Sequence, residues 1–225
     1  MTYNLFWISW CIHQYHNVWI SHTTVWKWII KFTKKAIKKV SNLKFQFSNV
    51  WHVDETVINV KGNNCYNWVI IDSISKFVIA SNLTLTRTKD ECNEIFAESK
   101  KITKNYPKFI FSDGYPGYSP VISNNFSNKK LEGTIEYNKT KHIKVIKISD
   151  EYCNNNLIER YMGYTKSFYK TRRAFCDLES ANIILKGLGI YYNFLRPHMS
   201  LEGKTPAKSL GCDLDVSNRW LSLIR

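Results

Sequence analysis

The sequence predicts a mixed α/β fold in which strands come first and most helices follow. Three β-rich runs separated by short turn signals occupy residues 51–85, and a compact apolar run begins after Pro107. Two long helical patterns then extend over residues 154–195. Strands on short turns form an antiparallel meander, whereas a strand reached through a helix pairs in parallel. We therefore expect one mixed sheet with helices packed on it.

The first forty residues are helical and basic by pattern. Apolar residues at intervals of three and four predict an amphipathic helix from Ser21 to Val40. Its opposite face carries Lys27, Lys31, Lys34, Lys35 and Lys38. With a first helix around Leu5–Tyr15 it would form a helix-turn-helix, so residues 1–40 are expected to bind DNA. A surface helix with solvated lysines is the alternative.

The sheet is expected to follow a linker at residues 41–49. The predicted strands are Trp51–Val60, Tyr66–Ile71 and Phe77–Leu85. Turn signals at residues 61–64 and 72–73 separate them.

A helix and a buried strand come next. Thr88–Glu91 reads as a capping box, and the helical stripe continues to Ile102. The run Lys108–Phe111 lacks alternation and suits a strand that is buried on both faces. Residues 123–142 are polar and are expected to form a loop with one short strand near Thr134–Tyr137.

Two helices close the predicted fold. The first spans Asn154–Lys170, with Leu157, Tyr161, Tyr164 and Phe168 on one face. The second spans about Leu178–Leu195 and ends before Pro197, which cannot continue a helix.

Charge and composition narrow the class of partner. The net charge is +14, and half of it lies in residues 1–53, which contain seven lysines and no acidic residue. Such asymmetry favours a polyanion, nucleic acid ahead of membrane. No run approaches the roughly 18 apolar residues of a spanning helix, and six scattered cysteines indicate reduced thiols rather than a disulfide framework. We expect a cytoplasmic, nucleoid-associated protein without membrane contact.

Two acidic residues stand where a carboxylate is costly. Asp54 interrupts an apolar strand, and Asp113 follows the buried strand at the end where open sheets place ligand sites. Parallel pairing of the first and fourth strands would bring them side by side. Neighbouring carboxylates repel each other unless a cation binds between them, and hard oxygen ligands suit Mg²⁺ or Mn²⁺.

A third acid is expected from a helix that packs over the same edge. Glu159 is the candidate, because its helix face also carries Asn156, Gly163, Lys166 and Lys170. Such a face could hold a metal at one end and follow a phosphate backbone. Glu55 alternates to the opposite face of the strand and Asp72 lies in a turn, so we interpret both as structural.

At these acids the sequence resembles the catalytic core of DDE transposases from prokaryotic insertion sequences, which are related to retroviral integrases. Asp54 is followed by Asp113 after 59 positions and by Glu159 after a further 46. The matching stretches are residues 51–56 (WHVDET), 112–114 (SDG), 156–160 (NLIER) and 192–198 (YNFLRPH), with Leu201 and Thr205-Pro206 beyond them.

The resemblance implies a ribonuclease H-like five-stranded sheet and a catalytic, metal-binding triad of Asp54, Asp113 and Glu159. It implies cleavage and strand transfer of double-stranded DNA by two-metal phosphoryl transfer, with two Mg²⁺ or Mn²⁺ ions. Joining two DNA ends implies a homodimer or a larger assembly. His142 resembles a histidine found in some relatives. The DNA contacts expected beside the triad are Asn156, Arg160, Lys166, Lys170, Arg172 and Arg173.

The expected organisation is a DNA-binding segment at 1–40, a linker at 41–49, a catalytic core at 50–212 and a tail at 213–225. About twenty residues precede the resemblance to a recognition helix at Ser21–Trp26, so the helix-turn-helix is expected to be incomplete. Two alternatives stay open beside an active transposase. One is a catalytically silent, truncated derivative that only binds DNA, and the other is a nuclease that cuts without strand transfer.

Overall fold

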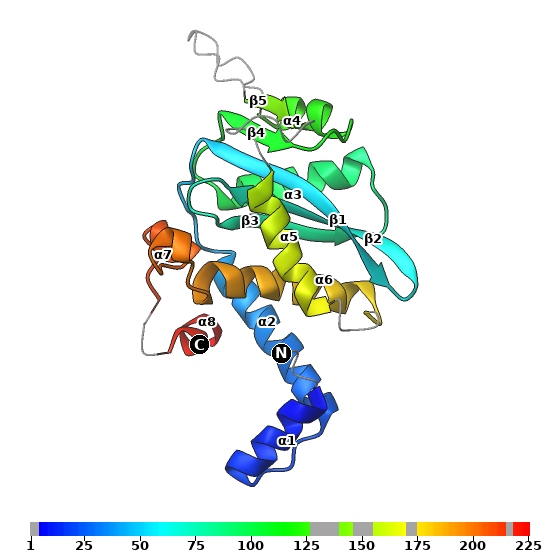
Figure 1. Cartoon of the computed structure of the whole chain (residues 1–225), viewed down its shortest axis with the longest axis vertical. Helices are drawn as coiled ribbons and strands as arrows, with labels where there is room; N and C mark the ends of the chain where they lie inside the picture. The colour runs from blue at the N-terminus through cyan, green and yellow to red at the C-terminus, as the bar shows by residue number, and fades with distance from the viewer. Residues whose placement is uncertain (1–4, 127–139, 146–154, 170–174, 215–217) are drawn as a thin grey trace.

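A computed structural model describes residues 5–126, 140–145, 155–169, 175–214 and 218–225 of the 225-residue chain. One five-stranded sheet forms its centre, with the strand order β3-β2-β1-β4-β5 (Figure 1). The strands are β1 (Val50–Val60), β2 (Asn63–Asp72), β3 (Val78–Thr84), β4 (Phe109–Ser112) and β5 (Lys141–Lys144). The first three are antiparallel, whereas β1, β4 and β5 run in parallel. The predicted mixed sheet is therefore confirmed.

Turn chemistry fixes the register of the first hairpin. Val60 pairs with Asn63, so the turn consists of Lys61 and Gly62 alone. Both have positive φ, at 53° and 85°, which matches the twist of a two-residue hairpin and which glycine adopts without strain. The three predicted antiparallel strands are confirmed with shifts of one to three residues at their ends.

The fourth strand differs from the prediction in its burial. In β4, Ile110 and Ser112 are buried, whereas Phe109 and Phe111 are only half-buried. The reason is that α5 (Asn156–Tyr169) crosses β1 and β2, so this face of β4 is only partly covered. The short strand expected near Thr134–Tyr137 falls outside the described residues, and the fifth strand of the sheet is β5.

Helices cover both faces of the sheet. On one face, α3 (Lys89–Ile102) packs against Trp68 and Ile70 of β2, together with α4 (Tyr118–Phe126). On the other face, α5 packs against Val69 and Ile71, and α6 (Leu178–Ile190) covers the far end of the hairpin. The capping box before α3 is confirmed. Helix α4 was not predicted, because Pro120, Ser123 and two asparagines obscure its apolar stripe.

An N-terminal pair of helices projects from this body (Figure 1). Helix α1 (Leu5–His16) packs on α2 (His22–Val40), and α2 packs on α6 and on the C-terminal α8 (Arg219–Ile224). The Ser21 hydroxyl caps α2 by accepting from the Thr24 amide at 3.1 Å. Residues 41–49, predicted as a linker, run from α2 to the sheet and bury Phe45 and Phe47 in the main core.

The last long helix keeps its predicted extent and changes its winding. After Ile190, α6 continues as one π-helical turn, η1 (Tyr191–Leu195), and Pro197 follows. Within η1 the Asn193 side chain accepts from the Val78 amide at 2.8 Å and donates to the Val78 carbonyl at 2.9 Å. Such a turn re-aims side chains without breaking the helix. The chain ends with η2 (Met199–Leu201), α7 (Pro206–Ser209) and α8.

Candidate active site

Two predicted acids meet where β4 ends. Val53 of β1 pairs with Ser112, the last residue of β4, so the residues that follow them, Asp54 and Asp113, are neighbours. Carboxylate oxygens of Asp54, Glu55 and Asp113 all lie within 4.8 Å of one another. The predicted parallel pairing is confirmed, and it juxtaposes the two acids as expected.

Burial and negative charge make Asp54 a strained acid. Burial raises the pKa of its carboxyl to about 7, and the charges of Asp113, Glu55 and Glu159 add to this effect. Among the described residues, the Glu55 amide supplies a compensating contact by donating to Asp54 Oδ1 at 2.9 Å. A nearby cation would relieve the repulsion.

Glu55 belongs to this group through its carboxylate, which sequence reasoning missed. Its side chain points to the other face of the sheet, as alternation predicted, and accepts from the Tyr118 hydroxyl of α4. Its carboxylate also pairs with the Arg87 guanidinium and is only 5% exposed. Because β4 ends at Ser112, opposite Val53 of β1, the carboxylate still reaches the edge that Asp54 and Asp113 occupy. Its position directly after Asp54 was the available signal.

Arg87 and Tyr115 hold the turn that carries Asp113. The Arg87 guanidinium lies 3.8 Å from Asp113 Oδ2 and 4.2 Å from the centroid of the Tyr115 ring. The Tyr115 amide donates to Asp113 Oδ1 at 3.1 Å, and its hydroxyl donates to the Arg87 carbonyl at 3.0 Å. These contacts orient the Asp113 side chain and place the positive charge of Arg87 beside it.

His142 lies beneath the same turn. The Ser112 hydroxyl donates to the Asp113 carbonyl at 2.7 Å, so its 2.7 Å contact with His142 requires a proton on Nε2. Nδ1 then accepts from the Ser119 hydroxyl at 2.8 Å. Burial, with help from Lys144, lowers the pKa of His142, which suits this neutral form. The histidine therefore ties β5 and α4 to the turn of Asp113.

Glu159 stands apart from the tight group, in the first turn of α5, with its side chain exposed. The start of α5 is anchored to β1 because Asn155 Oδ1 lies 3.3 Å from His52 Nδ1. Asp54 is two residues after His52 and faces the same side, so its pKa includes a contribution from Glu159. The exposed face of α5 continues from there through Arg160, Gly163 and Lys166.

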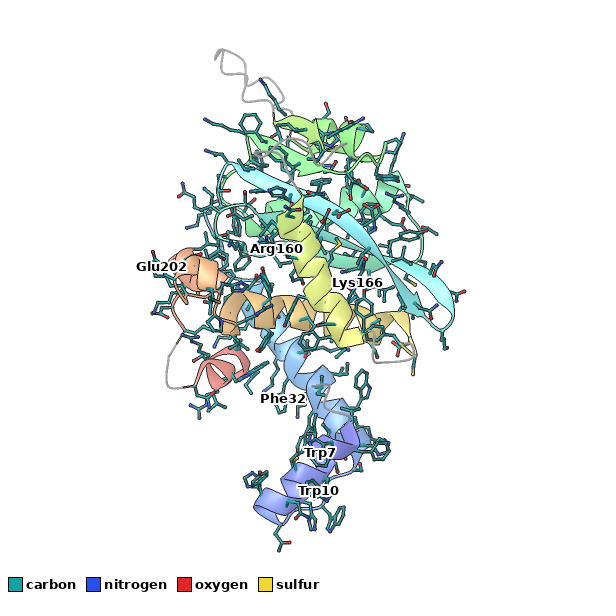
Figure 2. All side chains as sticks on the ribbon, in the orientation of Figure 1. Trp7, Trp10, Phe32, Arg160, Lys166 and Glu202 are labelled. Carbon is teal, nitrogen blue, oxygen red and sulfur yellow. The ribbon has the colours of Figure 1, made fainter. Side chains whose placement is uncertain are left out.

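The predicted DNA contacts fall into two exposed groups and one group that the structure does not describe. On α2 the lysine face is exposed, and Lys34 pairs with Glu179 at 2.9 Å. On α5, Asn156, Arg160 and Lys166 are exposed, and Figure 2 shows Arg160 near the start of the helix with Lys166 farther along it. Lys170, Arg172 and Arg173 lie outside the described residues.

The donor set fits a divalent cation. Glu55 is already engaged by Arg87 and Tyr118, which leaves the oxygens of Asp54 and Asp113 as the available ligands. Carboxylate oxygens are the preferred ligands of Mg²⁺ and Mn²⁺. Burial and acidic neighbours raise the pKa of Asp54, and the positive charge of a bound cation would oppose both effects by favouring the ionised carboxylate.

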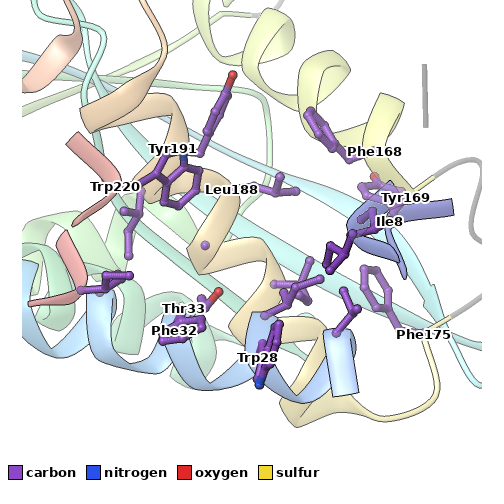
Figure 3. A pocket seen from close by; sticks show the side chains of 18 residues that line it. Ile8, Trp28, Phe32, Thr33, Phe168, Tyr169, Phe175, Leu188, Tyr191 and Trp220 are labelled. Atoms are coloured by element: carbon purple, nitrogen blue, oxygen red, sulfur yellow. The ribbon is translucent and has the colours of Figure 1, made fainter. Parts of the chain in front are cut away.

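A cavity in another part of the described structure has the wrong chemistry to bind a divalent cation. It measures about 680 Å³ and is lined by residues of α1, α2, α6 and α8 and by the end of α5 (Figure 3). Its lining includes Ile8, Trp28, Phe32, Leu188 and Trp220 and contains no charged residue. The acidic edge of the sheet is therefore the better candidate site.

No helix in the described part of the chain is long and apolar enough to cross a membrane.

The comparisons agree with this fold. Residues 48–198 match a family described as a DDE domain, that of IS240-type transposases. The catalytic core domain of HTLV-2 integrase, in its trimeric form with magnesium, is 18% identical with a TM-score of 0.50. The match covers 75% of this chain and 98% of that one. Comparison with curated proteins finds no match.

A second structure places the same fold within a larger assembly. One chain in the structure of the simian T-cell lymphotropic virus intasome, in complex with the PP2A regulatory subunit B56 gamma, is 14% identical to this chain in sequence and superposes with a TM-score of 0.52. The match covers 78% of this chain and 58% of that one.

The five-stranded mixed sheet with helices on both faces is thus the ribonuclease H-like fold of integrase cores, and the matched family makes the chain a polynucleotidyl transferase of the DDE type. The chain belongs to the DDE-type transposases of insertion sequences. Family and acidic cluster together make it a metal-dependent transposase.

Proposed function

We propose that this transposase cleaves DNA strands and transfers them to target DNA with Asp54, Asp113 and Glu159 as its catalytic triad. The observation that carries the proposal is the meeting of Asp54 and Asp113 at an open sheet edge, with the pKa of Asp54 raised to about 7. Such a pair is costly in a folded protein unless it binds a cation. Glu159 approaches the same edge from α5.

The triad would hold two Mg²⁺ or Mn²⁺ ions, the arrangement by which two-metal sites catalyse in-line phosphoryl transfer. When bound, the ions would supply activation of the attacking oxygen and stabilisation of the leaving oxygen. The structural neighbour from HTLV-2 contains magnesium, which supports the choice of metal.

The remaining residues of the site would position carboxylates and DNA. Arg87 pairs with Glu55 and so offsets part of the negative charge that this buried acid adds beside the metal site. His142 holds the turn of Asp113 through Ser112. Phosphate contacts are assigned to Asn156, Arg160 and Lys166 on α5, to Lys170, Arg172 and Arg173 after it, and to Lys27, Lys31, Lys34, Lys35 and Lys38 on α2.

The substrate would be double-stranded DNA, comprising the ends of the element and a target. Joining two ends in one event requires two active sites, so the active form would be a homodimer or a larger assembly on DNA.

The decisive experiment measures strand chemistry directly. Purified protein is incubated with Mg²⁺, a supercoiled target plasmid and a labelled duplex that carries the DNA flanking the coding sequence. Wild type is expected to nick the labelled strand and to join it to the plasmid. Asp54→Asn should abolish both products, because it removes a ligand and a negative charge while keeping the side-chain shape. Asp90→Asn, an exposed acid at the start of α3, serves as the matched control and should retain activity.

The same assay separates the competing functions. Nicking without joined products would identify a nuclease that does not transfer strands. Binding of the labelled duplex without any product would identify a catalytically silent DNA-binding derivative and would overturn the proposed function.

A further inference from the structure

Three cations from distant parts of the sequence gather beside α5. Lys76 lies in the turn between β2 and β3, Arg160 lies in the first turns of α5, and Arg196 follows η1. We call these residues the basic cluster. Arg196 belongs to the stretch Tyr192–His198, to which the strand chemistry proposed above gives no role.

Aromatic rings fix Arg196 against α5. Its guanidinium lies 4.4 Å from the centroid of the Tyr164 ring and 5.8 Å from that of Tyr192. Tyr164 is four residues after Arg160, and residues at this spacing are neighbours on one side of a helix. Arg196 is therefore held against the stretch of α5 that also carries Arg160. Asn193, bonded to Val78, fixes the π-helical turn that aims it.

Lys76 belongs to the basic cluster from the turn between β2 and β3. It has a positive φ of 60°, and its ammonium donates to the Ser200 hydroxyl. Burial lowers the pKa of Lys76, and the charge of Arg160 contributes to the shift. The Lys76 ammonium and the Arg160 guanidinium thus share one electrostatic environment.

His198 lies close enough to Lys76 and Arg196 for both positive charges to act on its pKa. Its Nε2 lies 3.4 Å from the Tyr192 carbonyl, which can only accept, so Nε2 carries the proton. Burial lowers the pKa of His198, and the charges of Arg196 and Lys76 lower it further. The neutral ring packs edge-on against Tyr192, with centroids 4.4 Å apart.

The basic cluster has no acidic partner in the part of the chain that the structure describes. Ion pairs form elsewhere, for example Lys186 with Glu98 at 2.9 Å and Lys204 with Glu202 at 3.0 Å. None of the described carboxylates lies within pairing distance of Lys76, Arg160 or Arg196. Like charges held together without a counter-charge favour the binding of an anion.

We propose that the basic cluster binds phosphate oxygens of a DNA strand that runs from the active site along α5. Arg160 is the residue after Glu159, so the cluster borders the proposed triad. A guanidinium suits phosphate because its donors form a planar fork, and stacking on tyrosine orders that fork in advance. The proposal rests on the proposed function, in that DNA is the anion. The strand could belong to the element end or to the target.

Affinity measured in EDTA tests the cluster apart from catalysis. Fluorescence anisotropy follows binding to two labelled duplexes over a range of salt concentrations. One duplex carries the DNA flanking the coding sequence, and the other is unrelated. Arg196→Gln and Lys76→Asn are each expected to weaken binding about fivefold to tenfold and to lower the salt slope by about one. Asn is chosen at residue 76 because it tolerates positive φ.

Matched variants separate a phosphate contact from a packing defect. Arg196→Lys keeps the charge and should restore most of the salt slope, even though it loses the stacking on Tyr164. Lys101→Gln removes a charge from exposed α3 on the other face of the sheet and should leave the slope unchanged. Thermal unfolding of every variant reports any loss of folding.

The two duplexes identify the source of the strand. A loss confined to the flanking duplex assigns the cluster to element ends, and an equal loss on both assigns it to target or general DNA. Wild-type slopes in both Arg196→Gln and Lys76→Asn would overturn the proposal, even for a protein that cuts and joins DNA. A lowered slope in a protein that forms no product would instead overturn the proposed function and leave the basic cluster standing.

Discussion

Asp54 is a largely buried strand residue. Its carboxylate accepts one hydrogen bond and has three acidic neighbours. In the unfolded chain its carboxyl would titrate at its ordinary pKa of 3.8, whereas in the folded protein the value rises to about 7. Between these values the folded state binds more protons than the unfolded state. The free energy of unfolding of the metal-free protein should therefore fall as pH rises from about 4 to about 7.

The variant Asp54→Asn removes this titration and keeps an acceptor for the Glu55 amide. In EDTA at pH 8 we expect it to be more stable than wild type by about 2 kcal/mol, which is less than the full shift would give because residual exposure screens the charge. The difference should shrink toward zero as pH approaches 4. Urea unfolding at several pH values measures it.

Two further measurements check the cause of this stability difference. Asp90→Asn changes an exposed acid and should not reproduce the gain at pH 8. Saturating Mg²⁺ should narrow the difference, because a bound cation stabilises ionised Asp54. A difference between Asp54→Asn and wild type that is the same at pH 4 and pH 8 would contradict the assigned origin.

At the scale of elements, α2 separates two tasks between its faces. Val25 and Ala36 are buried, and the lysines on the opposite side are exposed. One of them, Lys34, pairs with Glu179 of α6, but both side chains are more than half exposed. Exposed pairs of this kind contribute about 0–1 kcal/mol, so the face is available for another partner.

Neutralising this face tests whether α2 follows DNA. The triple variant Lys31→Gln, Lys34→Gln, Lys38→Gln should weaken binding to duplex DNA and reduce the salt slope by roughly two to three, because each lost phosphate contact removes about 0.9. Anisotropy titrations in increasing salt measure the slope. The matched arginine triple keeps the charges and should bind like wild type. An unchanged slope in the glutamine triple would leave α2 with a structural role only.

At the scale of the whole molecule, close helix packing joins the N-terminal pair to the catalytic body. Gly187 of α6 faces Thr33 of α2, and a Cβ at position 187 would lie 2.8 Å from Thr33 Cγ2. Glycine therefore permits the approach of α2, while the apolar cavity beside it leaves the rest of the contact incompletely filled (Figure 3).

Gly187→Ala should loosen this junction. We expect a loss of about 1 kcal/mol in the free energy of unfolding, because overpacking outweighs the gain in helix propensity. Cleavage by protease within residues 41–49 should also become faster. Urea unfolding and limited proteolysis measure the two effects.

A second glycine and a second-site change provide the controls for Gly187→Ala. At Gly163, in exposed α5, an added Cβ meets no atom within 4 Å, so Gly163→Ala should stabilise the protein rather than destabilise it. Adding Thr33→Ala to Gly187→Ala removes the clash and should recover slow cleavage. If Gly187→Ala kept the stability and the cleavage rate of the wild type, the close contact between α6 and α2 at this point would not be what holds the two helices together.

Much of the fold followed from local patterns in the sequence. The capping box at Thr88 and the turn within residues 61–64 are short-range features, and the structure contains both. Asp54 and Asp113 were visible for the same reason, since each is an acid attached to an apolar run. Their parallel strands then brought them together by topology alone.

Tertiary structure decided what no local pattern contains. Glu55 enters the acidic group because β4 stops at Ser112, and its partners, the Arg87 guanidinium and the Tyr118 hydroxyl, come from two other segments. The basic cluster likewise unites residues 76, 160 and 196, which are far apart along the chain. Sequence periodicity reports which face of an element is buried, whereas contacts between distant side chains depend on how the elements pack. The sequence alone therefore determined the class of fold and two of the acids, and packing determined the charges that surround them.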